Sequence, residues 1–197
     1  MDNRKDVDEF RSILASYGYK ELTPLQKSAF RLICKGANVL IIAPTGYGKT
    51  EAALFPIMFS LYKKVKSSVE VKGIQALYVT PLRALNRDIF RRMERLASDL
   101  GLIIKIRHGD TSQHERRKIS LKPPHILITT PETFQFLLVG KRIREALKNV
   151  KWVIVDELHE LMSSKRGLQL VLSLERLRQI TYRNYQRIAL SATIGSP

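Results

Sequence analysis

Short apolar runs recur along the chain, and stretches with helical periodicity lie between most of them. The runs are rich in Ile and Val at consecutive positions, which is typical of strands buried on both faces. They predict strands at Val39–Ile42, Ala76–Thr80, Ile103–Arg107, Ile126–Thr129, Val153–Val155 and Ile188–Ser191.

The intervening stretches repeat apolar residues with the period of an α-helix. Thr23 fits an N-cap, Pro24 fits the first helical position, and Gly36 fits the position just past the end of one such helix. Alternating strands and helices predict an α/β fold, with a mostly parallel sheet covered on both faces and a single domain over residues 1–197. The helices are expected at Glu9–Tyr17, Leu25–Ile33, Ala52–Tyr62, Leu82–Leu100, Pro131–Leu138, Ile143–Leu147 and Gly167–Ile180, and the polar segment Lys63–Lys72 is expected to be a mobile loop.

A Gly-rich turn joins the first predicted strand to the helix that follows it. Strand, Gly-rich turn, Lys-Thr and helix is the layout of a phosphate-binding loop, in which glycines let backbone N–H groups approach phosphate oxygens. In this pattern Lys49 reaches the β- and γ-phosphates and the Thr50 hydroxyl binds Mg²⁺, although Ala43 replaces the usual first glycine. The sequence thus predicts a nucleoside triphosphate site at Pro44, Thr45, Gly46, Tyr47, Gly48, Lys49 and Thr50.

Two acids, Asp156 and Glu157, directly follow the apolar strand Val153–Val155. Ligands of open α/β sheets bind outside the carboxyl ends of the strands, where the phosphate loop also begins. Asp156 is therefore expected to hold Mg²⁺ together with Thr50, and Glu157 to orient or deprotonate an attacking water. The alternative is an ordinary acidic helix N-terminus, but the phosphate loop favours catalysis by Lys49, Asp156 and Glu157.

The formal net charge of +16 favours a polyanionic partner such as nucleic acid, although basic surfaces also serve solubility. One cysteine, Cys34, excludes an internal disulfide and is expected to be a small buried apolar residue. The charged N-terminus and the short apolar runs indicate no signal peptide and no membrane span, and a cytoplasmic location is expected. The spacing of the four histidines matches no zinc site.

Six short motifs then follow one another in a fixed order. The chain resembles the first RecA-like domain of superfamily 2 helicases of DExH type, and the stretches around residues 156–161 and 165–177 are most similar to the Lhr (large helicase-related) branch. The motifs are Leu22-Thr23-Pro24-Leu25-Gln26, Ala43-Pro44-Thr45-Gly46-Tyr47-Gly48-Lys49-Thr50, Thr80-Pro81-Leu82-Arg83-Ala84-Leu85, Thr130-Pro131-Glu132-Thr133, Asp156-Glu157-Leu158-His159 and Ser191-Ala192-Thr193.

The resemblance implies a role for each motif, with ATP as the nucleotide. Gln26 would hydrogen-bond the adenine, and either Tyr19 or Phe10 would stack on it. Tyr47 would project over the phosphates or point outward. The remaining motifs would contact the sugar–phosphate backbone through Thr80, Pro81, Arg83 and Thr130, and would couple the nucleotide state to strand movement through His159, Ser191, Ala192 and Thr193.

An arginine row in the helix expected at Leu82–Leu100 bears on the same partner. Arg83, Arg87, Arg91 and Arg95 recur every four residues, and like charges at that spacing destabilise a helix slightly unless a counter-charge is present. A phosphate backbone and bulk solvent are both open as that environment. The basic cluster at residues 115–118 is expected to lie on a loop or helix surface.

The resemblance implies an ATP-dependent helicase motor acting on single-stranded nucleic acid, with DNA favoured over RNA. A second RecA-like domain, expected beyond Pro197, would supply the arginine fingers, since the sequence assigns that role to none of the arginines in this chain. An RNA helicase of Ski2-like or DEAD-box type is the alternative within the superfamily. A nucleic-acid binding module with a vestigial nucleotide site is the alternative of another class, and the intact Lys49, Asp156 and Glu157 argue against it.

Overall fold

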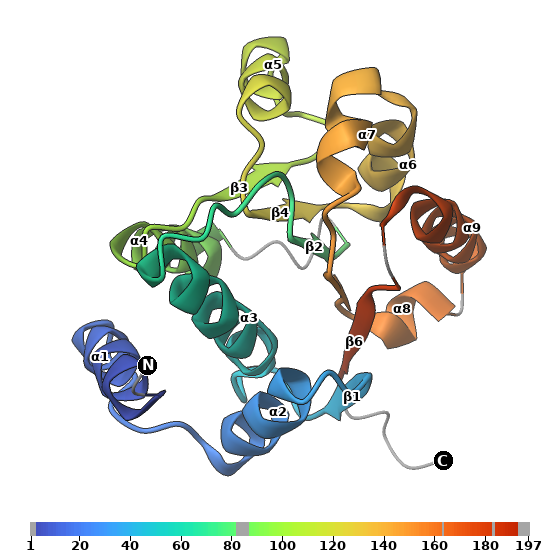
Figure 1. Ribbon diagram of the computed structural model, residues 1–197. Coiled ribbons are helices and arrows are strands. Elements are labelled where there is room, and N and C mark those ends of the chain that lie inside the picture. The colour runs from blue at the N-terminus through green and yellow to red at the C-terminus, as the bar shows by residue number, and fades with distance from the viewer. Residues whose placement is uncertain (1–2, 82–86, 163, 183, 193–197) are drawn as a thin grey trace, which may run out of the picture.

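The computed structural model describes residues 3–81, 87–162, 164–182 and 184–192. Its centre is a six-stranded sheet in the order β1-β6-β5-β2-β4-β3, and the neighbouring strands that it describes all run parallel (Figure 1). The parallel α/β sheet predicted from the sequence is therefore confirmed. The strands are β1 (Val39–Ile42), β2 (Ala76–Val79), β3 (Ile104–Arg107), β4 (Ile126–Thr129), β5 (Trp152–Val155) and β6 (Gln186–Ser191).

Helices cover both faces of the sheet, as Figure 1 shows. One core lies beneath α1 (Asn3–Ser16), α2 (Pro24–Cys34), α3 (Lys49–Lys66) and α4 (Arg87–Asp99). The second core lies beneath α5 (Gln113–Leu121), α6 (Pro131–Val139), α7 (Lys141–Leu147), α8 (Leu158–Met162) and α9 (Lys165–Ile180).

Side chains along the central strands alternate between these two cores. Tyr78 and Ile154 belong to the core beneath α3, and Leu77 and Val153 belong to the opposite one. Each of these four side chains is at most 1% exposed. The alternation follows from the period of two in a strand, and it explains why both positions of each run are apolar.

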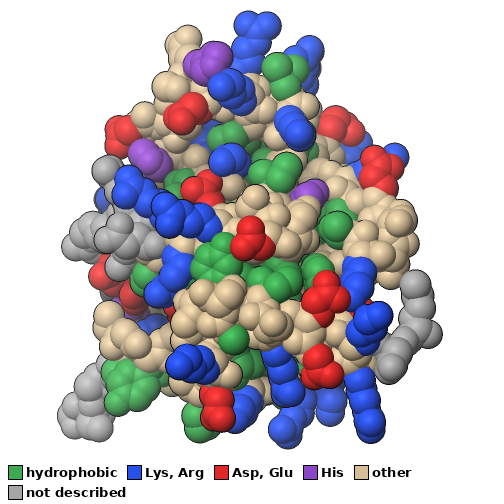
Figure 2. Space-filling model, turned by 90° about the vertical axis from the view of Figure 1, so that its left-hand side faces the viewer, with side chains coloured by type: hydrophobic (Ala, Val, Ile, Leu, Met, Phe, Trp, Pro, Cys, Tyr) green, Lys and Arg blue, Asp and Glu red, His purple; other side chains and the backbone are tan. Residues whose placement is uncertain are grey.

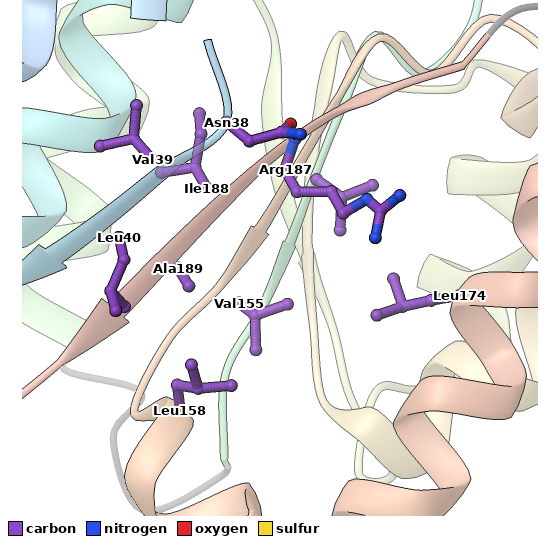
Figure 3. A pocket seen from close by; sticks show the side chains of 10 residues that line it. Asn38, Val39, Leu40, Val155, Leu158, Leu174, Arg187, Ile188 and Ala189 are labelled. Carbon is purple, nitrogen blue, oxygen red and sulfur yellow. The ribbon is translucent and has the colours of Figure 1, made fainter. Parts of the chain in front are cut away.

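The edge strand β1 departs from this pattern on one face. Leu40 and Ile42 are 54% and 53% exposed, so this face of β1 is not packed against the rest of the described chain. An apolar hollow of 360 Å³ results, bounded by β1, β5, β6 and the helices α8 and α9 (Figure 3). Arg187 is its one charged lining residue, so the hollow lacks the groups that bind a nucleotide.

Two expectations from the sequence are wrong. The segment Lys63–Lys72 was expected to be a loop, but its first four residues are helical and belong to the end of α3. The Lys66 ammonium pairs with the carboxylates of Asp6 and Glu9 on α1, which holds the last turn of α3 in place.

The second expectation concerned Cys34, which is exposed rather than buried. The buried side of α2 includes Ala29 and Ile33, and the next residue points about 100° away from it.

Other elements differ from expectation at their boundaries. The helix expected at Leu82–Leu100 is described from Arg87, and its residues Met93 and Leu96 are buried while Arg91 and Arg95 are exposed. The basic cluster at 115–118 lies on α5, which the sequence left as loop or helix. The five-residue helix α8 was not expected, since it is too short for a periodic pattern. No helix in the described ranges has the length and hydrophobicity needed to cross a membrane.

Thr23 is the N-cap of α2, as the sequence predicted, and it forms a capping box with Gln26. The Thr23 hydroxyl oxygen accepts a hydrogen bond from the Gln26 N–H at 3.2 Å, and the Gln26 side-chain oxygen accepts one from the Thr23 N–H at 3.0 Å. We expect Thr23→Ala to lower the free energy of unfolding by about 1 kcal/mol, because it removes the hydroxyl acceptor. Urea denaturation of the full-length protein measures the change. Ser67→Ala, at an exposed position after α3, serves as the control and should change it little.

Candidate nucleotide site

The turn between β1 and α3 has the backbone shape that the phosphate-loop pattern requires. Gly46 and Gly48 have φ angles of +86° and +77°, in the left-handed region that favours glycine. A Cβ atom at Gly48 would lie 2.5 Å from the Gln26 side-chain nitrogen, so a larger residue there would require the Gln26 side chain or the loop to shift. The helix α3 begins directly after this turn, at Lys49. The N–H groups of its first turn have no acceptor within the helix and lie next to the loop.

Lys49 is folded back over the loop that precedes it. Its ammonium donates hydrogen bonds to the carbonyls of Ala43 at 2.7 Å and Pro44 at 3.2 Å, and the residue is only 8% exposed. A buried ammonium is costly unless it is hydrogen-bonded, so these carbonyls hold the charge at the centre of the loop. A phosphate would compete for the same N–H donors with a full negative charge.

Asp156 lies at the carboxyl end of β5, where three donors converge on its buried carboxylate. Its Oδ1 accepts from the Glu157 N–H at 2.9 Å, and its Oδ2 accepts from the Tyr78 hydroxyl at 2.6 Å and the Thr80 hydroxyl at 3.4 Å. Burial raises the pKa of Asp156, and the donors together with Lys49 partly oppose this rise. The carboxylate is thus oriented before any ligand arrives.

Glu157 adopts a backbone conformation that is rare for a residue with a side chain. Its φ angle is +49°, in the left-handed region, where a non-glycine residue costs about 1–3 kcal/mol. Burial and the neighbouring charge of Asp156 raise the pKa of Glu157. A raised pKa makes a carboxylate a better proton acceptor, which suits a group that handles water.

One pocket of 490 Å³ brings the predicted catalytic and metal-binding residues together. Thr50 and Asp156 both line it, and their hydroxyl and carboxylate oxygens are the hard ligands that Mg²⁺ prefers. Mg²⁺ is usually held by one or two carboxylates and by substrate phosphates, so this donor set fits the ion. The pocket is lined by Thr45, Gly46, Gly48, Lys49, Thr50, Glu51, Ile89, Arg92, Asp156 and Glu157.

His159 connects this pocket to the end of β6. Its Nδ1 lies 3.5 Å from a Glu157 carboxylate oxygen, 3.2 Å from the Ser191 hydroxyl and 3.4 Å from the Ala192 N–H, which donates to it. The structure therefore brings three of the four predicted coupling residues into contact. The fourth, Thr193, lies outside the described residues.

A neighbouring pocket contains the residues predicted to bind the base. Gln26, Tyr19 and Tyr47 line it with the two loop glycines, and Tyr47 is 64% exposed. Phe10, the other aromatic considered for stacking, is only 3% exposed and packs its ring against Phe59 in the core. Of the two aromatics left open by the sequence, Tyr19 is therefore the one that the fold offers to a base.

Sequence reasoning missed three residues at the site, which are Glu51, Tyr78 and Arg92. Arg92 on α4 pairs with Glu51 at 3.2 Å and lies over the Tyr19 ring, 5.1 Å from its centroid. The Tyr19 hydroxyl also donates to Glu51 at 3.1 Å. Tyr78 reaches Asp156 from β2. No spacing marks these residues, because α3, α4 and β2 meet only in the folded chain.

Three of the four residues predicted to contact a nucleic-acid strand lie along the carboxyl edge of the sheet. Thr80 and Pro81 are buried there, Thr130 caps α6 with its hydroxyl, and Arg83 lies outside the described residues. Beside Thr130, a pocket of 470 Å³ opens between the ends of β3 and β4 and the helices α5, α6 and α9. Its lining residues include Arg107, His108, Arg116, Thr130, Phe136 and Arg166.

Comparison with known proteins identifies the family. The model of the DEAD/DEAH box helicases matches residues 23–197. The chain belongs to the DEAD/DEAH box helicase family. Within that family it is 49% identical, over 90% of its length, to the ATP-dependent helicase Lhr-Core of Sulfolobus acidocaldarius. It spans 21% of the length of that relative.

Solved helicase structures agree with the sequence likeness. The structure of the Mycobacterium smegmatis helicase Lhr bound to ssDNA and AMP-PNP matches 94% of this chain, with a TM-score of 0.80 and 39% identity, over 24% of its own chain. The DEAD-box helicase Mss116, bound to ssRNA and UDP-BeF, has a TM-score of 0.82 over 94% of this chain at 23% identity, a likeness in fold alone. The RecA-like fold and the similarity to the Lhr branch are confirmed.

The loop glycines yield a paired test of this geometry. Gly46→Ala and Gly48→Ala both place a side chain at positive φ, but only the second drives a Cβ atom into Gln26. We expect Gly48→Ala to weaken ATP binding more than Gly46→Ala does, because the Gln26 side chain, which is predicted to bind the adenine, or the loop itself must shift. Isothermal titration calorimetry on the full-length variants measures both affinities.

Gly36→Ala is the control for this pair. Gly36 also has a positive φ, of +82°, but it lies beyond the end of α2 and outside both nucleotide pockets. The Gly36→Ala variant should be less stable than the wild-type protein and should keep its ATP affinity. Equal ATP affinities for the Gly46 and Gly48 variants would contradict the predicted clash.

Proposed function

We propose that the chain is the ATP-binding motor domain of an ATP-dependent DNA helicase of Lhr type, which couples ATP hydrolysis to movement along a single strand. The observation that carries the proposal is the convergence of Lys49, Thr50, Asp156 and Glu157 on one pocket. An ammonium, a hydroxyl, a buried carboxylate and a second acid of raised pKa are the groups that hydrolysis of a nucleoside triphosphate requires.

Each group has a distinct role in this mechanism. Lys49 exchanges its bonds to the Ala43 and Pro44 carbonyls for bonds to the β- and γ-phosphates. Thr50 and Asp156 hold Mg²⁺, which when bound neutralises charge that develops on the phosphates. Glu157 orients a water for in-line attack on the γ-phosphate and accepts its proton. Gln26 and Tyr19 hold the adenine in the adjoining pocket.

Strand binding along the carboxyl edge of the sheet completes the proposal. The pocket beside Thr130 carries the guanidinium groups of Arg107, Arg116 and Arg166, which suit a phosphodiester backbone. It also carries the acids Asp110 and Glu132, and Glu132 pairs with Arg166 at 3.1 Å. Figure 2 shows Lys and Arg side chains spread over one face of the molecule with Asp and Glu among them. DNA is favoured over RNA because the similar M. smegmatis helicase was solved with ssDNA.

Coupling and completion of the motor need further parts. We assign coupling to His159, which contacts Glu157 on one side and the Ser191–Ala192 end of β6 on the other. A change at the γ-phosphate reaches β6 through this imidazole. A second RecA-like domain of the full-length protein would supply arginine fingers, which are worth about 10³–10⁵ in rate in related phosphoryl transfers.

The nucleotide site has a direct test in the full-length protein. Lys49→Ala should weaken MgATP binding strongly, because it removes the ammonium aimed at the phosphates. Glu157→Gln should keep MgATP binding and lose most hydrolysis, because the amide preserves size but accepts no proton. Calorimetry and phosphate release measure the two effects.

The same measurements distinguish a helicase motor from a nucleic-acid binding module with a vestigial nucleotide site. A motor shows ATP turnover that rises when single-stranded DNA is added, whereas a vestigial site shows no turnover in the unaltered protein. Wild-type ATP affinity in Lys49→Ala, or hydrolysis within about twofold of wild type in Glu157→Gln, would contradict the assigned roles.

Salt dependence tests how the strand is held. If phosphate contacts dominate, log K for single-stranded DNA should fall steeply with log salt and vary little with base sequence. Arg83→Ala should reduce the slope by about one unit, because one phosphate contact is lost. Fluorescence anisotropy at several salt concentrations measures the slope.

Arg11→Ala removes the same charge from exposed α1, away from the carboxyl edge, and should leave the slope unchanged. A slope near zero for the wild-type protein would refute phosphate-dominated binding. A matched single-stranded RNA in the same titration distinguishes the two polymers, since tighter RNA binding would favour the RNA helicase alternative.

A further inference from the structure

Tyr78 is a fully buried polar residue that belongs to none of the sequence motifs. It lies in the middle of β2, and its ring packs edge-on against Phe90 of α4, with the ring centroids 5.6 Å apart. Its hydroxyl nevertheless reaches the nucleotide site, because β2 pairs with β5 in parallel and Tyr78 is opposite Ile154, two residues before Asp156. The ring therefore carries a hydroxyl from the core to the predicted metal carboxylate.

We propose that Tyr78 is a positioning residue for Mg²⁺, which holds the Asp156 carboxylate in the orientation that the metal requires. The inference rests on the proposed function and deepens it, since it adds a residue that does not itself bind the ion. Three distances carry it: the Tyr78 hydroxyl lies 2.6 Å from Asp156 Oδ2 and 3.5 Å from the Thr50 hydroxyl, and the Thr80 hydroxyl lies 3.4 Å from the same Oδ2.

The hydroxyl of Tyr78 is a stronger constraint than the other donor on this oxygen. A hydrogen bond of 2.6 Å to a carboxylate is short and charge-assisted, whereas the Thr80 contact at 3.4 Å is long. Because the Tyr78 ring is fixed by close packing, the oxygen that it holds is also fixed. Each carboxylate oxygen has two lone-pair sites, so the Tyr78 and Thr80 hydroxyls fill those of Oδ2, while Oδ1, which accepts the Glu157 N–H, keeps one site for a further partner.

The same hydroxyl also links the two residues predicted to bind the metal. Thr50 comes from α3 and Asp156 from the end of β5, and the phenol oxygen lies between their side chains. Partners that orient metal ligands typically contribute about 10–100-fold to metal affinity. A buried tyrosine that served stability alone would need one acceptor of any kind, and it would leave metal affinity unchanged when its hydroxyl was removed.

Tyr78→Phe in the full-length protein tests the proposal, because it keeps the ring and removes only the hydroxyl. ATP affinity is measured by calorimetry in EDTA and across a Mg²⁺ titration. We expect an unchanged affinity in EDTA and a Mg²⁺ midpoint about tenfold higher than in wild type. Thr80→Val should shift the midpoint in the same direction by a smaller factor, since its hydrogen bond to Oδ2 is longer.

Tyr185→Phe is the matched control. Tyr185 is also buried, and its hydroxyl donates to the Leu174 carbonyl at 2.8 Å, remote from the nucleotide pocket. It should lose stability as Tyr78→Phe does and keep the wild-type Mg²⁺ midpoint. Equal midpoints for wild type and Tyr78→Phe would overturn the positioning role alone. Failure of the wild-type protein to bind ATP with Mg²⁺ would overturn the proposed function, and this inference with it.

Discussion

The nucleotide site depends on one constraint, the parallel arrangement of the strands in the central sheet. Parallel strands end at the same edge, so the loop after β1, the acids after β5 and the serine at the end of β6 become neighbours. β6 lies between β1 and β5, which sets the distance between the phosphate loop and the acids. An antiparallel pair at any of these positions would move one part of the site to the opposite edge.

The core beneath α3 supports a site that is unfavourable in itself. Asp156 is a buried carboxylate, Lys49 is a buried ammonium, and Glu157 has a left-handed backbone. Each costs free energy in isolation, and each is compensated by nearby hydrogen bonds or by the packing of α3. The first three turns of that helix are buried at nearly every position. Strained and buried polar groups of this kind are typical of functional sites, where orientation before ligand binding matters more than stability.

His159 and Arg92 extend the site in two directions from the same pocket. His159 leads from Glu157 to the end of β6, and Arg92 leads from Glu51 to the Tyr19 ring at the base pocket. Glu51 lines both pockets, so the pocket predicted for the base and the pocket predicted for the phosphates share one connected set of side chains. Occupation of the base pocket can thereby influence the geometry of the phosphate pocket through Tyr19 and Glu51.

The sequence by itself determined the elements and the local chemistry of the site. Short apolar runs marked each strand of the described sheet, and the loop around Lys49 and the Asp156–Glu157 pair were recognisable because their residues are neighbours along the chain. The tertiary structure alone decided that Tyr19 rather than Phe10 faces the base pocket, that Cys34 is exposed, and that Tyr78 and Arg92 belong to the site. These outcomes depend on which strands and helices become neighbours, and the physical reason is that burial and contact are properties of packed surfaces, which local periodicity does not specify.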